Sequence, residues 1–201
     1  MVRWLVAAFL AAELLCASAA YAQSEADAAP VRGSRELQLW ISQSHALAYL
    51  SGGRNSNLFQ VGIRYGWVLT APHGPGPLRG QFEYAPEFIP LILPFQSSGT
   101  TYGIGLNPVS LKWIFERHGR FVPYLDGTAG GMVSHGRVPP QGSNFNFMAS
   151  GGLGVHILRG RYMWSVDTRV FHISDAFIVA RDPTYNMIQV RVGFGLFRPP
   201  K

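Results

Sequence analysis

The stretch FQVGIRYGWVL, residues Phe59–Leu69, indicates the fold class of this chain. Large apolar side chains occupy every second position from Phe59 to Leu69, and most positions between them, such as Arg64 and Gly66, carry polar or small residues. Successive side chains of a β-strand point to opposite faces, so a period of two predicts a strand. One face of this strand is apolar and partly aromatic, and the other holds a charge and glycines.

The same alternation recurs in segments separated by Gly, Pro, Asn and Ser, and no convincing amphipathic helix interrupts them. We expect strands near residues 36–50, 57–70, 78–92, 100–116, 120–134, 144–158, 160–174 and 185–197. Apolar faces alternating with charged or glycine-rich faces favour an all-β fold, an eight-stranded antiparallel transmembrane (outer-membrane) β-barrel. A soluble sandwich or lipocalin-like barrel is the alternative, because it places similar apolar faces in a core.

The polar faces of these strands carry charges of both signs. A barrel of eight strands has an interior that side chains fill, so these charges are expected to pair inside it. The expected interior residues are Arg64, Arg79, Glu83, Glu87, Asp167, Arg169 and Arg191.

The N-terminal residues 1–22 have the features of a Sec signal peptide, with Arg3, an apolar run and the cleavage pattern Ala20-Tyr21-Ala22. A lipoprotein signal at Cys16 is the alternative, but the residue before such a cysteine is small and Leu15 is not. Cleavage after Ala22 removes the only cysteine, so the exported chain is expected to fold without a disulfide. Residues 23–35 are predicted to be a flexible lead-in, and residues 36–201 a single barrel domain.

The formal net charge of +6 does not indicate a nucleic-acid partner. Lysine occurs only at Lys112 and Lys201, and the arginines are scattered rather than grouped along a surface that could follow a phosphate backbone. Anionic lipid headgroups are the more suitable partner for an exported basic protein.

The stretch RVFHISDAFIVARDPTYN, from Arg169 to Asn186, carries the candidate chemistry. Counting by twos from Val170 places His172 and Ser174 on the apolar face of their strand, and Asn186 shares a face with Ile188. The three polar residues adjoin a long connection of the kind that outer-membrane barrels place outside the cell. They are either ordinary interfacial residues or a nucleophile and base directed at a lipid. The spacing of the other histidines suggests no metal site, and no cofactor is expected.

The motif His172-x-Ser174-Asp175-Ala176, followed by an Asp-Pro loop and Asn186, resembles the lipid A 3-O-deacylases (PagL-type) of the outer-membrane acyloxyacyl hydrolase group. The similarity extends loosely to Arg64-Tyr65-Gly66, to the strand Arg79–Tyr84, and to Gly142–Phe145 before the glycines at 151–154. The resemblance implies an eight-stranded barrel with a Ser-His-Glu triad on its outer surface. It implies Ser174 as the nucleophile and His172 as the general base of a serine esterase that removes the 3-O-linked acyl chain of lipid A.

The sequence departs from the family pattern at two positions. Asn186 stands where the triad has Glu, and Asp175 stands where the family has a supporting Asn. Asn186 can accept the imidazole N–H through its carbonyl oxygen, which orients the ring without adding charge; Asp175 and Asp182 are supporting candidates. Asp175 can approach His172 only at a bulge or strand end. A non-catalytic barrel with a degenerate triad is the alternative function.

The expected partner is lipid A or lipopolysaccharide in the outer leaflet, and a homodimer is a further possibility. Three arginines in the predicted outside loops are weaker candidates for contacts with lipid A phosphates. They are Arg54, Arg137 and Arg181.

Overall fold

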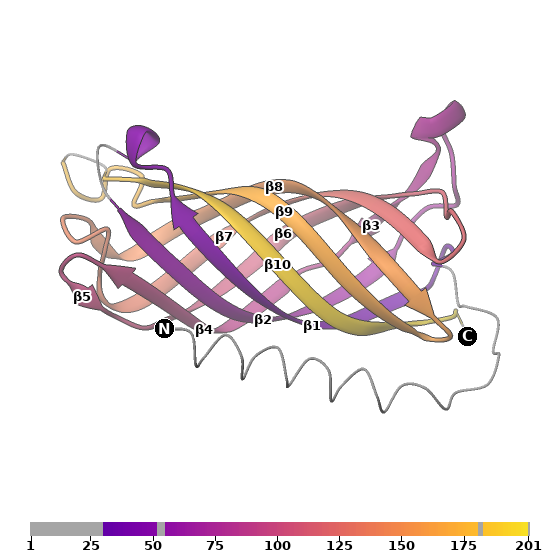
Figure 1. The fold of residues 1–201 in the computed structure, drawn as a ribbon, viewed down its shortest axis with the longest axis horizontal. Coiled ribbons are helices and arrows are strands. Elements are labelled where there is room, and N and C mark those ends of the chain that lie inside the picture. The colour runs from indigo at the N-terminus through magenta and orange to yellow at the C-terminus, as the bar shows by residue number, and fades with distance from the viewer. Residues whose placement is uncertain (1–29, 52–54, 181–182, 201) are drawn as a thin grey trace, which may run out of the picture.

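The computed structural model describes residues 30–51, 55–180 and 183–200, and Figure 1 shows their strands wound into one sheet. The predicted signal peptide, and the predicted lead-in up to residue 29, lie outside the described residues. The strands are β1 (Arg35–Ala46), β2 (Ser56–Val68), β3 (Gly80–Tyr84), β4 (Glu87–Gln96), β5 (Gly99–Thr100), β6 (Gly103–Phe115), β7 (Phe121–Val138), β8 (Ser143–Arg159), β9 (Tyr162–Ser174) and β10 (Tyr185–Arg198). Two 3-10 turns, η2 (Ala48–Leu50) and η3 (Gly76–Leu78), lie in connections. No helix in the described part of the chain is long and apolar enough to cross a membrane.

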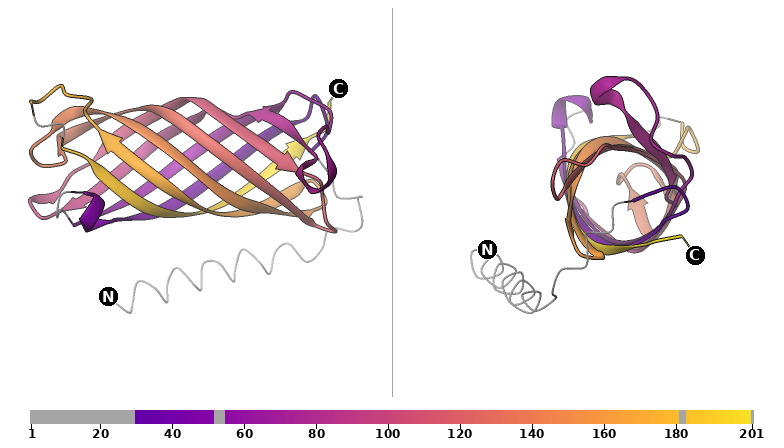
Figure 2. Two further views of the ribbon diagram at one scale, coloured as in Figure 1. Left: turned by 90° about the horizontal axis from the view of Figure 1, so that it is seen from above. Right: turned by 90° about the vertical axis from the view of Figure 1, so that its right-hand side faces the viewer.

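The sheet closes on itself, because β1 pairs with β10 on one side and with β2 on the other. From β10 the pairing continues through β9, β8 and β7 to β6, and β3 and β4 connect β6 back to β2. Neighbouring strands in this ring are antiparallel, and the end-on view in Figure 2 shows the ring directly. The predicted all-β antiparallel class is therefore confirmed.

The described residues form ten strands where the sequence predicts eight. The predicted strand 78–92 is divided at Ala85-Pro86 into β3 and β4, both of which pair with β2 and with β6. Proline has no N–H to donate to a β-ladder, so the ladder is interrupted there. The other additional strand, β5, is a two-residue strand that pairs with β4 in the connection to β6.

The two faces of the sheet differ sharply in chemistry. Along β9, Val166 and Val170 are exposed on the outside, whereas Asp167 and Arg169 are buried on the inside. The other strands show the same division, and Leu39, Leu153 and Val190 each expose half or more of their surface. The alternation that predicted the strands therefore also predicted which of their faces is apolar.

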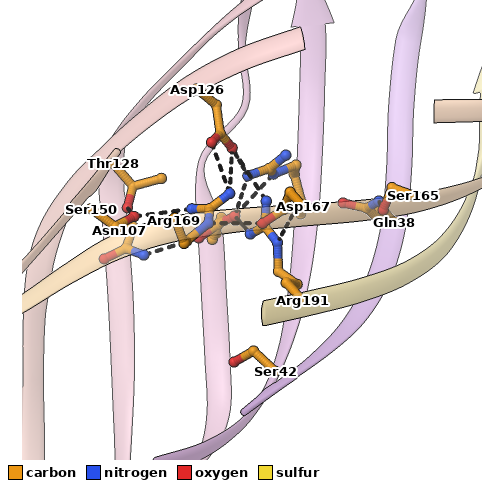
Figure 3. Close-up of polar contacts among 12 residues, drawn as sticks. Gln38, Ser42, Asn107, Asp126, Thr128, Ser150, Ser165, Asp167, Arg169 and Arg191 are labelled. Atoms are coloured by element: carbon orange, nitrogen blue, oxygen red, sulfur yellow. Dashed lines mark hydrogen bonds and ion pairs between the residues drawn. The ribbon is translucent and has the colours of Figure 1, made fainter. Parts of the chain in front are cut away.

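Three arginines and three carboxylates meet inside the ring, and Figure 3 shows Asp126, Asp167, Arg169 and Arg191 among them. Asp126 accepts hydrogen bonds from Arg64 at 2.7 Å, from Arg169 at 2.7 Å and from Arg191 at 3.2 Å. Glu87 and Asp167 complete the network, which joins β2, β4, β7, β9 and β10. A separate cluster joins Lys112 to Glu36 and Glu83.

The interior position predicted for Arg79 is wrong. The strand that was expected to begin at residue 78 begins at Gly80, and Arg79 directly follows the η3 turn. Its side chain is about half exposed and pairs with Glu116 at 2.8 Å.

Two apolar clusters fill other parts of the interior. One contains Met163 and Phe197, and the other contains Phe171, Ile173 and Met187. Phe171 and Ile173 flank His172 in β9, so their packing on the inside anchors the strand segment that presents His172 on the outside.

Candidate active site

His172 and Asn186 lie side by side on the outer face of β9 and β10. They are register partners in the antiparallel ladder, and both are half-buried. The Nδ1 atom of His172 lies 2.8 Å from the Oδ1 atom of Asn186. Because a carbonyl oxygen only accepts, this contact is a hydrogen bond donated by the imidazole Nδ1–H. In the neutral ring the other nitrogen, Nε2, then carries the lone pair that can accept a proton.

Ser174 is the last residue of β9 and shares the outer face with His172. Residues two apart on a strand are separated by about 7 Å along its axis, so His172 and Ser174 occupy successive outward-facing positions of β9. The next residue, Asp175, is fully buried, which agrees with its predicted position on the opposite face. Its carbonyl accepts the N–H of Ile178 at 3.1 Å, and the turn holds Ala176 and Phe177 at positive φ angles of 51° and 66°.

The connection between β1 and β2 reaches the same site, which the sequence did not predict. The side-chain N–H of Asn186 donates to the carbonyl oxygen of Leu50 at 2.7 Å. The hydroxyl of Ser51 accepts the backbone N–H of Asn186 at 3.0 Å. Figure 1 shows why these segments meet, since the end of β1, which leads into η2, and the start of β10 lie at the same end of the sheet. No motif in Ala48–Ser51 signals this role.

An apolar groove of about 750 Å³ on the outer surface extends across the strands as far as β9, where His172 lines it. Small residues follow one another across the ladder, because His172 pairs with Ala149, which pairs with Ala129. Large side chains line the rest of the groove. They include Phe88, Ile104, Leu106, Val133, Phe145 and Phe147. The groove therefore accommodates an elongated apolar group with one end at the imidazole.

Of the remaining predicted site residues, only Arg137 lies within the described part of the chain. Arg137 is exposed near the end of β7, and its carbonyl accepts a hydrogen bond from Gln96 at 3.0 Å. Arg54, Arg181 and Asp182 lie outside the described residues. Within the described ranges, no group of three or more His, Cys, Asp or Glu side chains could hold a metal ion.

The chain is thus a closed β-sheet protein whose candidate site lies on the outer face, with the His172 imidazole lining an apolar groove and hydrogen-bonded to the Asn186 amide. Comparison with known families identifies the group within that class. The family model described as lipid A 3-O-deacylase (PagL) matches residues 34–195. The chain belongs to this family.

One solved structure that matches with a TM-score above 0.5 shows the same fold. The structure described as the outer membrane enzyme PagL matches with a TM-score of 0.56 and 14% identity, covering 79% of this chain and 97% of that one. Neisserial surface protein A (NspA) matches with a TM-score of 0.45 and 15% identity over 83% of this chain and 98% of its own. The outer membrane protein OprG from Pseudomonas aeruginosa matches with a TM-score of 0.46 and 10% identity, over 84% of this chain and 97% of its own. No match was found among curated proteins.

Proposed function

We propose that this chain is an outer-membrane serine esterase that removes the 3-O-linked acyl chain from lipid A. The observation that carries the proposal is the family match over residues 34–195, which spans nearly all of the described sheet. The closed sheet would span the membrane as a barrel of eight strand positions, with β3 and β4 sharing one position between β2 and β6.

The outer surface supports a membrane location. Soluble monomers rarely expose continuous apolar patches of more than a few hundred Å². Here large apolar side chains are exposed on strand after strand, among them Ile41, Leu106, Leu125, Val166 and Val192. The charges are instead paired inside the ring, which is the arrangement expected of an outer-membrane barrel.

The proposed chemistry is acyl transfer in two steps. The Oγ atom of Ser174 attacks the carbonyl carbon of the ester while the Nε2 atom of His172 takes the hydroxyl proton. The same nitrogen returns that proton to the departing sugar oxygen, which leaves an acyl-serine. Water, deprotonated by His172, then attacks the acyl-serine and releases the fatty acid and the free serine. Neither step needs a cofactor.

The apolar groove supports a substrate that lies in the membrane. A groove lined by aliphatic and aromatic side chains suits an acyl chain and offers few polar partners to a soluble ester. Because His172 lines the groove, an acyl chain lying in it would bring its ester end to the base, and Ser174 follows two residues later on the same face of β9. One chain supplies Ser174, His172 and Asn186, so the proposal needs no second copy.

The direct test is expression of the full chain in a Gram-negative host whose lipid A retains its 3-O-linked chains, followed by mass spectrometry of the lipid A. We expect the loss of one 3-O-linked chain, and Ser174→Ala should slow this loss by about 10³-fold or more. Thr168→Ala removes a hydroxyl from the same face of the same strand and should leave the loss unchanged. Deacylation that persists in Ser174→Ala would exclude Ser174 as the nucleophile. A folded wild-type chain that removes nothing would instead favour the non-catalytic barrel with a degenerate triad.

A further inference from the structure

Asn186 raises a question of orientation that a glutamate would not raise. A carboxylate offers an acceptor oxygen with either of its two atoms, whereas an amide offers one acceptor and one donor group. An asparagine can therefore orient His172 for catalysis only if its oxygen, and not its nitrogen, faces the imidazole. The structure contains a partner that distinguishes these two orientations.

That partner is the carbonyl oxygen of Leu50, which accepts the Asn186 side-chain N–H at 2.7 Å. If the amide were turned over, its Oδ1 atom would face the Leu50 oxygen, and two acceptors would meet without a proton between them. The Nδ2 atom would then face His172 Nδ1 and would demand the tautomer that carries its proton on Nε2. That tautomer has no lone pair on Nε2 with which to deprotonate Ser174.

The position of the Leu50 carbonyl depends on Ser51. The Ser51 hydroxyl accepts the backbone N–H of Asn186 at 3.0 Å and donates to the backbone oxygen of the same residue at 3.2 Å. The backbone N–H of Leu47, on the other side of η2, also donates to that oxygen, at 2.8 Å. Ser51 is fully buried, so these bonds are shielded from water. The turn is therefore attached to the residue whose side chain it orients.

We propose that the β1–β2 connection selects the productive orientation of the Asn186 amide, with Ser51 as the positioning residue. The proposal rests on the proposed function for its catalytic meaning, but the His172 tautomer is a property of the folded chain alone. In this arrangement the Asn186 amide orients His172 as a triad carboxylate would. It can do so because the β1–β2 connection determines which end of the amide, the oxygen or the nitrogen, faces the imidazole.

The first experiment reads the tautomer without any substrate. The full chain, labelled with ¹⁵N-histidine and folded in detergent micelles, is compared with Ser51→Ala and Ser51→Thr, and His172→Gln assigns the resonance. We expect the Nδ1–H form of His172 in the wild-type chain, a mixture of tautomers in Ser51→Ala, and recovery of the Nδ1–H form in Ser51→Thr. An unchanged tautomer in a folded Ser51→Ala protein would overturn the proposal. Heat-dependent migration on a gel confirms that each variant is folded.

The second experiment measures the effect of Ser51→Ala on kcat and KM in the wild-type chain and in the Asn186→Asp variant. Ser51→Ala should lower kcat by roughly 10-fold and leave KM nearly unchanged, since one orienting hydrogen-bond system is weakened and the groove is untouched. In Asn186→Asp the side chain presents an oxygen to His172 in either orientation, so Ser51→Ala should have a much smaller effect there. Equal losses in the two backgrounds would show that Ser51 acts only on general structure. If the wild-type chain removes no acyl chain, the proposed function fails while the tautomer measurement still decides the present inference.

Discussion

At the residue scale, the amide of Asn186 can perform only one of the two functions of a triad carboxylate. A carboxylate orients the imidazole, and it also stabilises the imidazolium that forms during the reaction. In serine proteases, an amide in place of the carboxylate lowers kcat by about 10⁴, largely because the histidine adopts the wrong tautomer. In this chain the Leu50 carbonyl holds the amide with its oxygen toward His172. The orienting task is therefore retained, and we expect only the loss of the charge to slow the reaction.

If the Asn186 amide orients His172, removing the amide should slow the reaction. Asn186→Leu preserves the approximate size of the side chain but leaves the His172 Nδ1–H without its acceptor. A hydrogen bond to a charged group is worth about 1.5–3 kcal/mol, so kcat should fall by roughly 10- to 150-fold. The measurement is the deacylation rate in mixed micelles of detergent and lipid A. Ile188→Leu, an apolar exchange on the same face of β10, should change the rate less than twofold, and a similar fall in both variants would contradict the assigned role.

At the element scale, the groove depends on which side chains lie next to one another on neighbouring strands. Ala149 in β8 pairs with His172 in β9 and with Ala129 in β7, so small side chains continue the path away from the imidazole. Gly131 lies one row further along, and a Cβ atom there would meet the Phe145 ring at 3.3 Å. Enlarging Ala129, Ala149 or Gly131 should therefore fill the groove without disturbing the backbone of β9.

Ala149→Phe is the sharpest form of this prediction. The added ring should occupy the end of the groove beside His172, raising KM or abolishing turnover for long acyl chains more than for short ones. Leu153→Phe is the matched control, because Leu153 faces outward on the same strand and does not line the groove. Deacylation of synthetic glycolipids with different acyl lengths measures the effect. Equal rates for Ala149→Phe and the control would show that the groove does not hold the acyl chain.

The strands and their faces were predictable because period-two alternation is a local property of the sequence. It placed Arg64, Asp167 and Arg191 inside the sheet and His172 and Asn186 outside. It did not predict the break at Ala85-Pro86, since the inside–outside pattern continues across it from Glu83 to Glu87.

Contacts between distant segments could not be predicted in this way. The Leu50–Asn186 hydrogen bond joins residues 136 positions apart and uses a backbone carbonyl, which has no signature in the sequence. The groove likewise requires the register of several strands, because no single segment contains its row of small residues. The residue types of the candidate site could therefore be predicted from a short segment, whereas the orientation of the Asn186 amide and the groove beside His172 could not.

At the scale of the whole molecule, the interior network links strands that are far apart in the ring. Asp126 on β7 accepts hydrogen bonds from arginines on β2, β9 and β10, and three carboxylates balance the three arginine charges. The same β9 and β10 carry the candidate site on their outer face. The network therefore supports the register on which the His172–Asn186 contact depends.

Removing one carboxylate from this network should destabilise the whole sheet. Asp126→Asn keeps the shape of the side chain but leaves three buried arginines with two carboxylates, and breaking a buried ion pair costs about 3–5 kcal/mol. Glu116→Gln is the control, because it breaks an ion pair, Arg79–Glu116, in which both side chains are about half exposed. Exposed ion pairs contribute less than about 1 kcal/mol. Urea titration in micelles, read by heat-dependent gel migration, should show a clearly lower unfolding midpoint for Asp126→Asn only. Similar midpoints for the two variants would mean that the apolar clusters and the ladder, rather than the interior charges, hold the ring in register.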